Sequence, residues 1–265
     1  MKSIGIDAGG SLLKLAYLEN NRYHYKQFPI QDLDQAVSWV QLTAPQATFK
    51  VTGGKASIVQ QKLTGADVKI VPEFDAVCLG TKEMIIHEKH YFHDFMIVSM
   101  GTGTSFYLMK ENQYERLFGS GIGGGTLLGL GQLLLATRDF QQIVELAKKG
   151  ERNSVDLLVK DLYEGEEPPI PGHLTAANFG KPDLSQSPVE DVAAALFQMI
   201  GETMVLLGKQ FAAPHQVQKF VYVGGTISHN PPLQKVINSF DSMLQHESIF
   251  LQNGTFAGAV GALVY

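Results

Sequence analysis

The sequence is poor in cysteine and in long apolar runs. Cys78 is the only cysteine among the 265 residues, which excludes an internal disulfide and is typical of a protein from a reducing cytosol. No apolar run approaches the length that spans a bilayer. The strand-like segment Ile4–Asp7 begins too early for a signal peptide to precede it. We therefore expect a cytoplasmic protein without a membrane partner.

Positive charge is scarce as well. The 21 Lys and Arg residues are outnumbered by 26 Asp and Glu, which gives a net charge of -5, and the basic residues form no runs. A nucleic-acid surface is therefore not expected. The 8 histidines show no metal-ligand spacing, which argues against a zinc site. Hydrophobic residues make up 45% of the chain, enough for one large domain or two small lobes.

The order of predicted elements repeats along the chain. A hairpin, a third strand, a helix, a strand and a helix come first, and a shift of 92 residues aligns Gly9 with Gly101, Glu19 with Glu111 and Asn20 with Asn112. Repetition of a β-β-β-α-β-α unit predicts two similar lobes that face a cleft. We place them at residues 1–92 and 93–265. Predicted strands of the first unit are 3–7, 12–18, 23–28, 48–51 and 68–71, and its helices are 32–40, 55–63 and 75–89.

The second part of the chain is richer in helix. Its strand, turn and helix signals follow the usual apolar spacings and glycine positions. Ser187, followed by Pro188 and Glu190, is a strong signal for the N-cap of a long helix that ends near Phe211. We predict strands at 95–99, 105–109, 114–118 and 219–223, a glycine loop at 119–125, an irregular stretch at 166–180, and helices at 126–136, 139–149, 156–163, 187–211, 232–242 and 253–263.

Two glycine turns occupy equivalent places in the two units. The first runs from Asp7 through Gly9 and Gly10 to Ser11, and the second is Gly101–Ser105. Glycine lets the backbone approach phosphate oxygens and point N–H groups at them. Asp7 could hold Mg²⁺ at the strand end, and Lys14 could reach a phosphate. Either turn alone could be an ordinary hairpin turn, but two in equivalent positions favour a phosphate site.

Two further glycine segments precede helices. Gly119–Thr126 opens a helix, where free N–H groups would form an anion site. It lacks the Gly-Lys-Ser/Thr of a Walker loop and the distal acid of a dinucleotide fold. The Gly224-Gly225-Thr226 turn could receive an adenosine, although a tight strand–helix turn explains it equally well.

Glu73 is the best acid–base candidate. It follows a strand and precedes the predicted helix, whose N-cap we assign to Asp75. A carboxylate at such a position can accept a hydroxyl proton during phosphoryl transfer. Arg116 lies shortly before the glycine loop and could pair with a substrate carboxylate or a transferring phosphate. A solvated surface residue is the plain alternative for both.

Together these segments resemble the type II pantothenate kinases, which belong to the actin–hexokinase–acetate kinase superfamily. The most specific matches are Glu73-Phe74-Asp75-Ala76 and the loop Gly121–Gly125, and the resemblance extends over essentially the whole chain, including Asp156–Tyr163, Leu174–Gly180 and Asn253–Ala262. It implies an α/β, two-lobed actin-like ATPase fold of the ribonuclease H type, built from duplicated β-β-β-α-β-α units.

The resemblance also implies an activity and residue roles. The family reaction is ATP-dependent phosphorylation of pantothenate to 4′-phosphopantothenate, which leads to coenzyme A. Glu73 would be the general base and Arg116 a pantothenate contact, and Asp7 would take part in binding Mg²⁺. Relatives are homodimers, and the helix from Ser187 is a candidate interface. The implied nucleotide contacts are Asp7, Ala8, Gly9, Gly10, Ser11, Leu12, Leu13, Lys14, Thr102, Gly124, Gly125, Thr126, Leu127, Leu128, Phe140 and Thr226.

One departure and two alternatives stand beside this resemblance. Relatives often have a glycine where this chain has Phe118, so the path of the loop is not predicted. A sugar or N-acetylhexosamine kinase of the same superfamily usually uses an Asp as base, and Glu73 beside Phe74 argues against it. A nucleotide sensor without catalysis would lack a base or a phosphate turn, and neither is missing.

Overall fold

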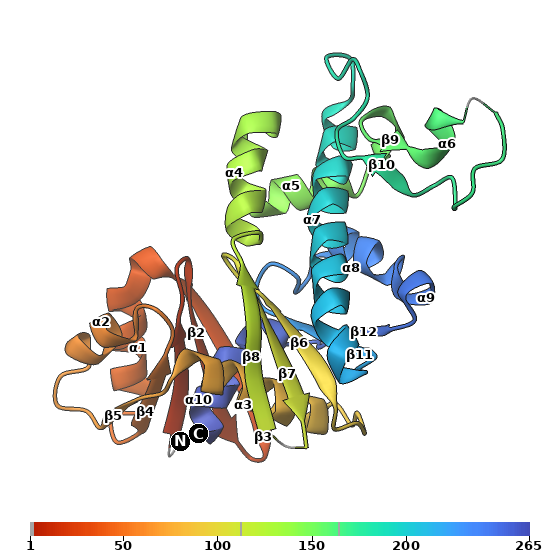
Figure 1. The fold of residues 1–265 in the computed structure, drawn as a ribbon. Coiled ribbons are helices and arrows are strands. Elements are labelled where there is room, and N and C mark those ends of the chain that lie inside the picture. The colour runs from red at the N-terminus through yellow and green to blue at the C-terminus, as the bar shows by residue number, and fades with distance from the viewer. Residues whose placement is uncertain (1–2, 112, 164) are drawn as a thin grey trace.

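Two five-stranded sheets with the same strand order form the centre of the molecule (Figure 1). The computed structural model describes residues 3–111, 113–163 and 165–265, so Asn112, paired above with Asn20, lies outside the described residues. The first sheet has the order β3-β2-β1-β4-β5, with β1 (Ser3–Ala8), β2 (Leu12–Glu19), β3 (Arg22–Pro29), β4 (Thr48–Thr52) and β5 (Val68–Ile70). The second has the order β8-β7-β6-β11-β12, with β6 (Phe95–Met100), β7 (Thr104–Lys110), β8 (Gln113–Ser120), β11 (Lys219–Val223) and β12 (Glu247–Phe250).

The pairing of strands confirms the predicted fold class and its duplication. In each unit the first strand pairs antiparallel with the second and parallel with the fourth. Strands β1 and β6 begin at Ser3 and Phe95, which is the shift of 92 residues found in the sequence. Both glycine turns therefore join the first two strands of a sheet. Of the five strands in each sheet, β12 is the one that the apolar pattern did not predict.

The connections differ much more than the sheets. In the first unit, α1 (Leu33–Thr43) and α2 (Ala56–Lys62) connect the last three strands. The second unit has a long helical arm between β8 and β11. In Figure 1, α4 and α7 rise side by side from the second sheet, and the two-stranded sheet β9–β10 lies near the far end of α7. The arm contains α4 (Gly124–Leu135), α5 (Phe140–Ala147), β9 (Leu157–Leu158), α6 (Val159–Leu162), β10 (Thr175–Ala177) and α7 (Val189–Ala212), and β11 is followed by α8 (Pro231–Asn238) and α9 (Asp241–Leu244).

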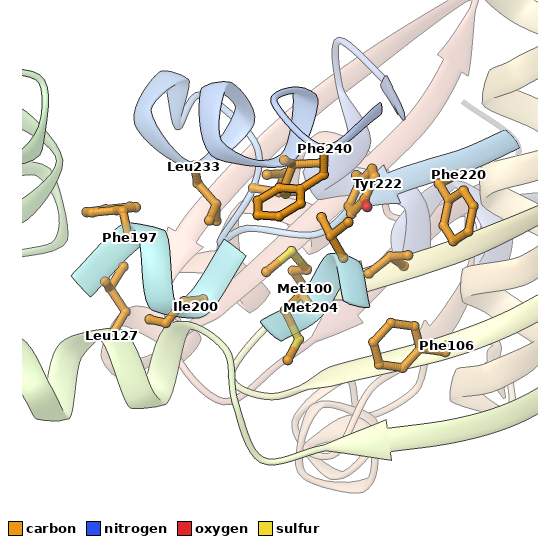
Figure 2. Packing of buried hydrophobic residues seen from close by; sticks show 14 of the residues in the cluster. Met100, Phe106, Leu127, Phe197, Ile200, Met204, Phe220, Tyr222, Leu233 and Phe240 are labelled. Atoms are coloured by element: carbon orange, nitrogen blue, oxygen red, sulfur yellow. The ribbon is translucent and has the colours of Figure 1, made fainter. Parts of the chain in front are cut away.

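Helix α7 is the core helix of this arm. Figure 2 shows its residues Phe197, Ile200 and Met204 among apolar side chains from α4, α8 and the second sheet. With the 3-10 turn that follows, Val189–His215 is long and apolar enough to cross a bilayer by length and composition alone. The expectation that no apolar run approaches that length is therefore wrong. Because 56% of its most apolar stretch is buried inside the protein, packing accounts for this composition.

Several predicted boundaries need correction. The N-cap of α7 is Pro188 rather than Ser187, whose hydroxyl donates to the Ser154 carbonyl over 3.1 Å. The predicted helix at 156–163 is a short strand followed by one helical turn, since residues 157–158 pair with 175–177. That pairing also places a strand in the stretch predicted to be irregular. Both errors come from partners distant in sequence.

The last helix of each unit packs against the sheet of the other unit. Helix α10 (Ala257–Val264) lies against β1, β2 and β4, whereas the buried side of α3 (Glu73–His87) joins an apolar cluster with the second sheet. The two helices also cross each other between the sheets (Figure 1). The boundary at residues 92 and 93 stays a prediction, because α10 lies on the first sheet although it closes the second unit.

Glycine allows this crossing. A Cβ at Gly80 would overlap the carbonyl oxygen of Ala257, and a Cβ at Gly261 would overlap that of Ala76. The backbones of α3 and α10 are therefore in direct contact. Any side chain at either position would force the helices apart and change the separation of the sheets.

We expect Gly261→Ala to destabilise the protein. Alanine favours helix over glycine by up to about 1 kcal/mol, but here its methyl group meets backbone, and overpacking costs typically 1–3 kcal/mol. The free energy of unfolding, measured with urea, should fall. Gly129→Ala in α4 is the matched control, since no atom lies within 4 Å of the added methyl, and it should be neutral or stabilising. Equal effects of the two substitutions would contradict the close contact.

Candidate active site

A cavity of ≈ 960 Å³ lies between the two units. Both glycine turns border it, as do the turn after β11 and the beginning of α10. Most of the predicted site residues line this cavity. They are Asp7, Gly9, Gly10, Ser11, Leu12, Lys14, Glu73, Thr102, Arg116, Gly124, Gly125, Leu128, Phe140 and Thr226.

Four predicted residues do not line the cavity. Ala8, Leu13 and Leu127 are buried in the apolar cores, because alternate residues of a strand, and the inner face of a helix, point away from the site. The hydroxyl of Thr126 donates to the carbonyl of Gly121 over 2.9 Å. These residues can shape the turns around a ligand, but their side chains are engaged elsewhere.

The first turn holds an acidic side chain at the base of the cavity. The Asp7 carboxylate lies 3.8 Å from the Lys14 ammonium on the neighbouring strand. A Cβ at Gly53 or at Gly258 would lie 2.8 Å from one of its oxygens, so two backbones enclose it. Burial raises the pKa of Asp7, and the positive charge of Lys14 opposes that increase. A bound cation would favour the ionised form in the same way.

The donor set around Asp7 fits one kind of metal ion. Within residues 3–111, 113–163 and 165–265, no group of three His, Cys, Asp or Glu side chains could hold a metal by itself. Mg²⁺ does not need such a group, because it binds through one or two carboxylates, several waters and the phosphates of a nucleotide. A single carboxylate beside a phosphate turn therefore fits Mg²⁺ that arrives with a nucleotide.

The second turn is fastened by the glycine loop. The backbone N–H groups of Gly124 and Gly125 donate to the carbonyls of Gly101 and Thr102, each over 2.8 Å. Thr226 also donates its hydroxyl hydrogen to Gly101, over 2.7 Å. The interpretation of this helix N-terminus as a ready anion site is therefore wrong for these two N–H groups, which the turn already occupies. A Cβ at Gly123 would lie 2.8 Å from Gly103, so glycine serves close packing here.

The loop itself is shorter than predicted. Gly119 and Ser120 belong to β8, and Gly124 and Gly125 begin α4. Phe118, the departure from related sequences, packs against Phe211 with ring centroids 4.7 Å apart and an interplanar angle of 31°. Strand β8 therefore continues past this position instead of turning at it.

Glu73 is the first residue of α3, and Pro72 rather than Asp75 is the N-cap. Pro72 has the extended backbone that precedes a helix, with φ -57 and ψ 135, and its ring fixes φ. Glu73 faces the cavity, where partial removal from water and then the negative charge of Asp7 raise its pKa. A carboxyl group with a raised pKa accepts a proton more readily than an ordinary one.

Arg116 reaches the same end of the cavity from β8. It pairs across the strands with Tyr107 of β7, next to a bulge that leaves Leu117 without a partner. Tyr107 lines the cavity, and burial raises the pKa of its phenol to about 12. Glu73, Tyr107 and Arg116 thus gather at one end, whereas Leu128 and Phe140 lie in the helical arm.

Some cavity residues escaped sequence reasoning. Ser99 occupies in the second unit the place that Asp7 has in the first, and the shift of 92 residues gives this equivalence directly. Tyr107 could have been predicted as a cavity residue, because it lies two positions after Ser105 and alternate residues of a strand share a face. Thr52 and Arg138 carry no comparable signal, because only the folded chain brings them to the cavity.

The two sheets of equal strand order define a class, the two-lobed α/β proteins of actin-like fold. Two solved structures share the fold. The activator of the 2-hydroxyisocaproyl-CoA dehydratase from Clostridium difficile with bound ADPNP has a TM-score of 0.63 at 14% identity, over 100% of this chain and 94% of that one. A ROK family glucokinase from Streptomyces griseus in complex with glucose and AMPPNP has a TM-score of 0.58 at 16% identity, over 99% and 98%.

Sequence relatives identify the family within this class. The Fumble family model matches residues 21–265. A type II pantothenate kinase from Oceanobacillus iheyensis is 41% identical over 266 residues, which cover 100% of this chain and 99% of the relative. A second, from Bacillus cereus, is 36% identical over 269 residues, with 100% and 98% covered. The chain therefore belongs to the type II pantothenate kinase family, as its sequence motifs indicated.

Proposed function

We propose that this chain transfers the γ-phosphoryl group of ATP to the terminal hydroxyl of pantothenate, with Glu73 as the general base. The product is 4′-phosphopantothenate, and the reaction opens coenzyme A biosynthesis. The observation that carries the proposal is the position of Glu73, which faces the same cavity as both glycine turns. Membership of the family supports the choice of acceptor.

ATP would lie along the cavity from the helical arm to Glu73. Leu128 and Phe140 offer apolar surface for the adenine ring, and the turns at Gly9–Ser11 and Gly101–Gly103 would hold the phosphates. Thr102 lies against Gly10, with its hydroxyl 3.4 Å from where a Cβ would stand, so the turns approach each other closely. Asp7 would bind Mg²⁺, which neutralises phosphate charge when bound. Lys14, beside Asp7, adds a positive charge near the same phosphates.

The acceptor would bind at the other end. Its hydroxyl donates to the Glu73 carboxylate, which takes the proton as the oxygen attacks phosphorus. Arg116 can pair with the pantothenate carboxylate or with charge on the transferring group, because its planar guanidinium donates two parallel hydrogen bonds. Phosphoryl transfer depends mainly on such positioning and charge stabilisation.

Glu73→Gln should bind ATP normally and phosphorylate poorly. The amide keeps the shape of the side chain but cannot take the proton, and loss of a general base typically costs about 10²–10⁴ in rate. A coupled assay with pantothenate measures turnover, and titration with a fluorescent ATP analogue measures binding. N-acetylglucosamine serves as the control acceptor and should give no turnover with either protein. Near-normal turnover of the variant would exclude Glu73 as the base.

The pH dependence of kcat/KM should have an acidic limb above pH 4.5, the ordinary pKa of a glutamic acid side chain. The base works only when ionised, and both partial burial and the charge of Asp7 raise its pKa. Activity should therefore fall as pH decreases through that raised pKa. The limb should be absent from the residual activity of Glu73→Gln. Full activity of the wild-type protein at pH 4.5 would contradict this expectation.

We further propose a cytoplasmic homodimer that associates through the helical arm. Leu133 and Leu134 on α4 and Leu206 on α7 are exposed, with Leu133 at 79%, and α4 lies against α7. Exposed leucines on adjoining helices favour a self-association surface. The predicted interface on the helix after Ser187 agrees with this placement.

Leu133→Glu should convert the dimer to a monomer, because a charge would be buried in the apolar contact. Light scattering should change from twice the chain mass of 29.0 kDa to that mass itself. Leu42→Glu is the control, since Leu42 is equally exposed, at 84%, on α1 of the first unit. A monomeric wild-type protein, or a dimer with Glu at position 133, would contradict the interface.

A further inference from the structure

Phe74 is a large aromatic residue that the proposed reaction does not use. It follows Glu73 in the first turn of α3, and 47% of its surface is exposed. Its neighbours Glu73 and Val77 line the cavity, so Phe74 lies at the rim. Core packing does not explain a half-exposed phenylalanine next to the base, and its contacts with other residues suggest another role.

The ring of Phe74 contacts two residues of the second sheet. The guanidinium carbon of Arg116 lies over it, 4.9 Å from the ring centroid. The ring of Tyr107 meets it edge-on, with centroids 5.8 Å apart and an interplanar angle of 60°. A guanidinium over an aromatic face is attracted by the negative charge density of the ring. The contact of Tyr107 limits how far that ring can rotate.

Arg116 is held from a second direction as well. A Cβ at Gly119 would overlap its guanidinium, which therefore lies against the backbone of β8. Arg116 is an exposed residue, so without these two contacts its side chain could adopt many conformations. The ring of Phe74 and the backbone of Gly119 together restrict it.

Arg116 and Glu73, which both act on the acceptor in the proposed function, do not pair with each other in the described part of the chain. Glu73 immediately precedes Phe74, yet no ion pair within 4.0 Å joins Glu73 to Arg116 in the described part of the chain. Arginine and a carboxylate form strong bidentate pairs when their geometry allows. Such a pair would occupy the base and the acceptor contact at once, and pantothenate would have to break it.

We propose that Phe74 is a positioning residue that holds the Arg116 guanidinium on its ring and apart from the Glu73 carboxylate. Both groups then remain available to the acceptor. The proposal rests on the proposed function, because an unpaired Glu73 and an unpaired Arg116 matter only if both act on the acceptor. Since Phe74 belongs to α3 and Arg116 to β8, the contact also joins the two sides of the cavity.

The first experiment separates an aromatic face from plain apolar bulk. Phe74→Leu keeps apolar bulk but offers no ring, whereas Phe74→Tyr keeps the ring. We expect the leucine variant to lose on the order of 10-fold or more in kcat/KM for pantothenate, with KM for ATP unchanged. The tyrosine variant should retain activity. Tyr91→Leu, an exposed aromatic substitution outside the cavity, is the control for general effects, and thermal unfolding checks that all variants are folded.

A double-mutant cycle tests whether Phe74 acts through Arg116. If it does, Phe74→Leu combined with Arg116→Ala should be little worse than Arg116→Ala alone. Additive losses, or equal activity of the leucine and wild-type proteins, would overturn the positioning role while leaving the proposed function intact. Loss in the tyrosine variant equal to that of leucine would also overturn it. If Arg116→Ala itself has no effect, the acceptor contact in the proposed function fails, and the role of Phe74 with it.

Discussion

The direct contact between the backbones of α3 and α10 is the constraint on which the site depends. Each helix ends one unit and packs on the sheet of the other, so their crossing fixes how far apart the sheets lie. Gly80 and Gly261 permit that contact because they have no Cβ. The same helices carry two positions of the proposed site, with Glu73 at the start of α3 and Gly258 of α10 against Asp7. A change of helix spacing would therefore move the proposed base relative to the glycine turns, so core packing and the geometry of the proposed site cannot vary independently.

Glycine has a different role here from the one that a nucleotide-binding pattern first indicates. The sequence interpretation gave the Gly119–Thr126 segment free N–H groups for an anion. In the structure the N–H groups of Gly124 and Gly125 fasten α4 to the second glycine turn, and Gly123 packs on Gly103. The loop therefore holds the turn in place, and in the proposed function it would act on the phosphates through that turn, because preorganised groups bind charge better than mobile ones. Gly5 on the first sheet also serves close packing, because a Cβ there would overlap the Ala259 carbonyl of α10.

The features that sequence could predict are those set by local pattern or by repetition. Alternating apolar residues located nine of the ten sheet strands, and the shift of 92 residues predicted two equivalent turns, because each depends on neighbours along the chain. Strand β12 and the pairing of β9 with β10 depend on distant partners, and the pattern missed them. The N-cap at Pro72 instead of Asp75 was a local error, since an acid in the first turn and an acid at the cap look alike in sequence. Contact between Phe74 and Arg116 could not be predicted, because it joins residues of different units across a cavity.

The two units have the same architecture but contribute different chemistry. Ser99 replaces in the second unit the carboxylate that Asp7 supplies in the first, so the acidic side chains of the cavity, Asp7 and Glu73, both come from the first unit. Both arginines of the cavity, Arg116 and Arg138, come from the second. In the proposed function a second acid at Ser99 would repel the phosphates from the opposite wall, whereas arginines there would attract them. Opposite charges on facing walls would also attract each other when the cavity is empty. An aromatic ring at the rim, which holds one arginine without neutralising any carboxylate, is a physical solution to that conflict, and it explains why a half-exposed phenylalanine stands next to the base.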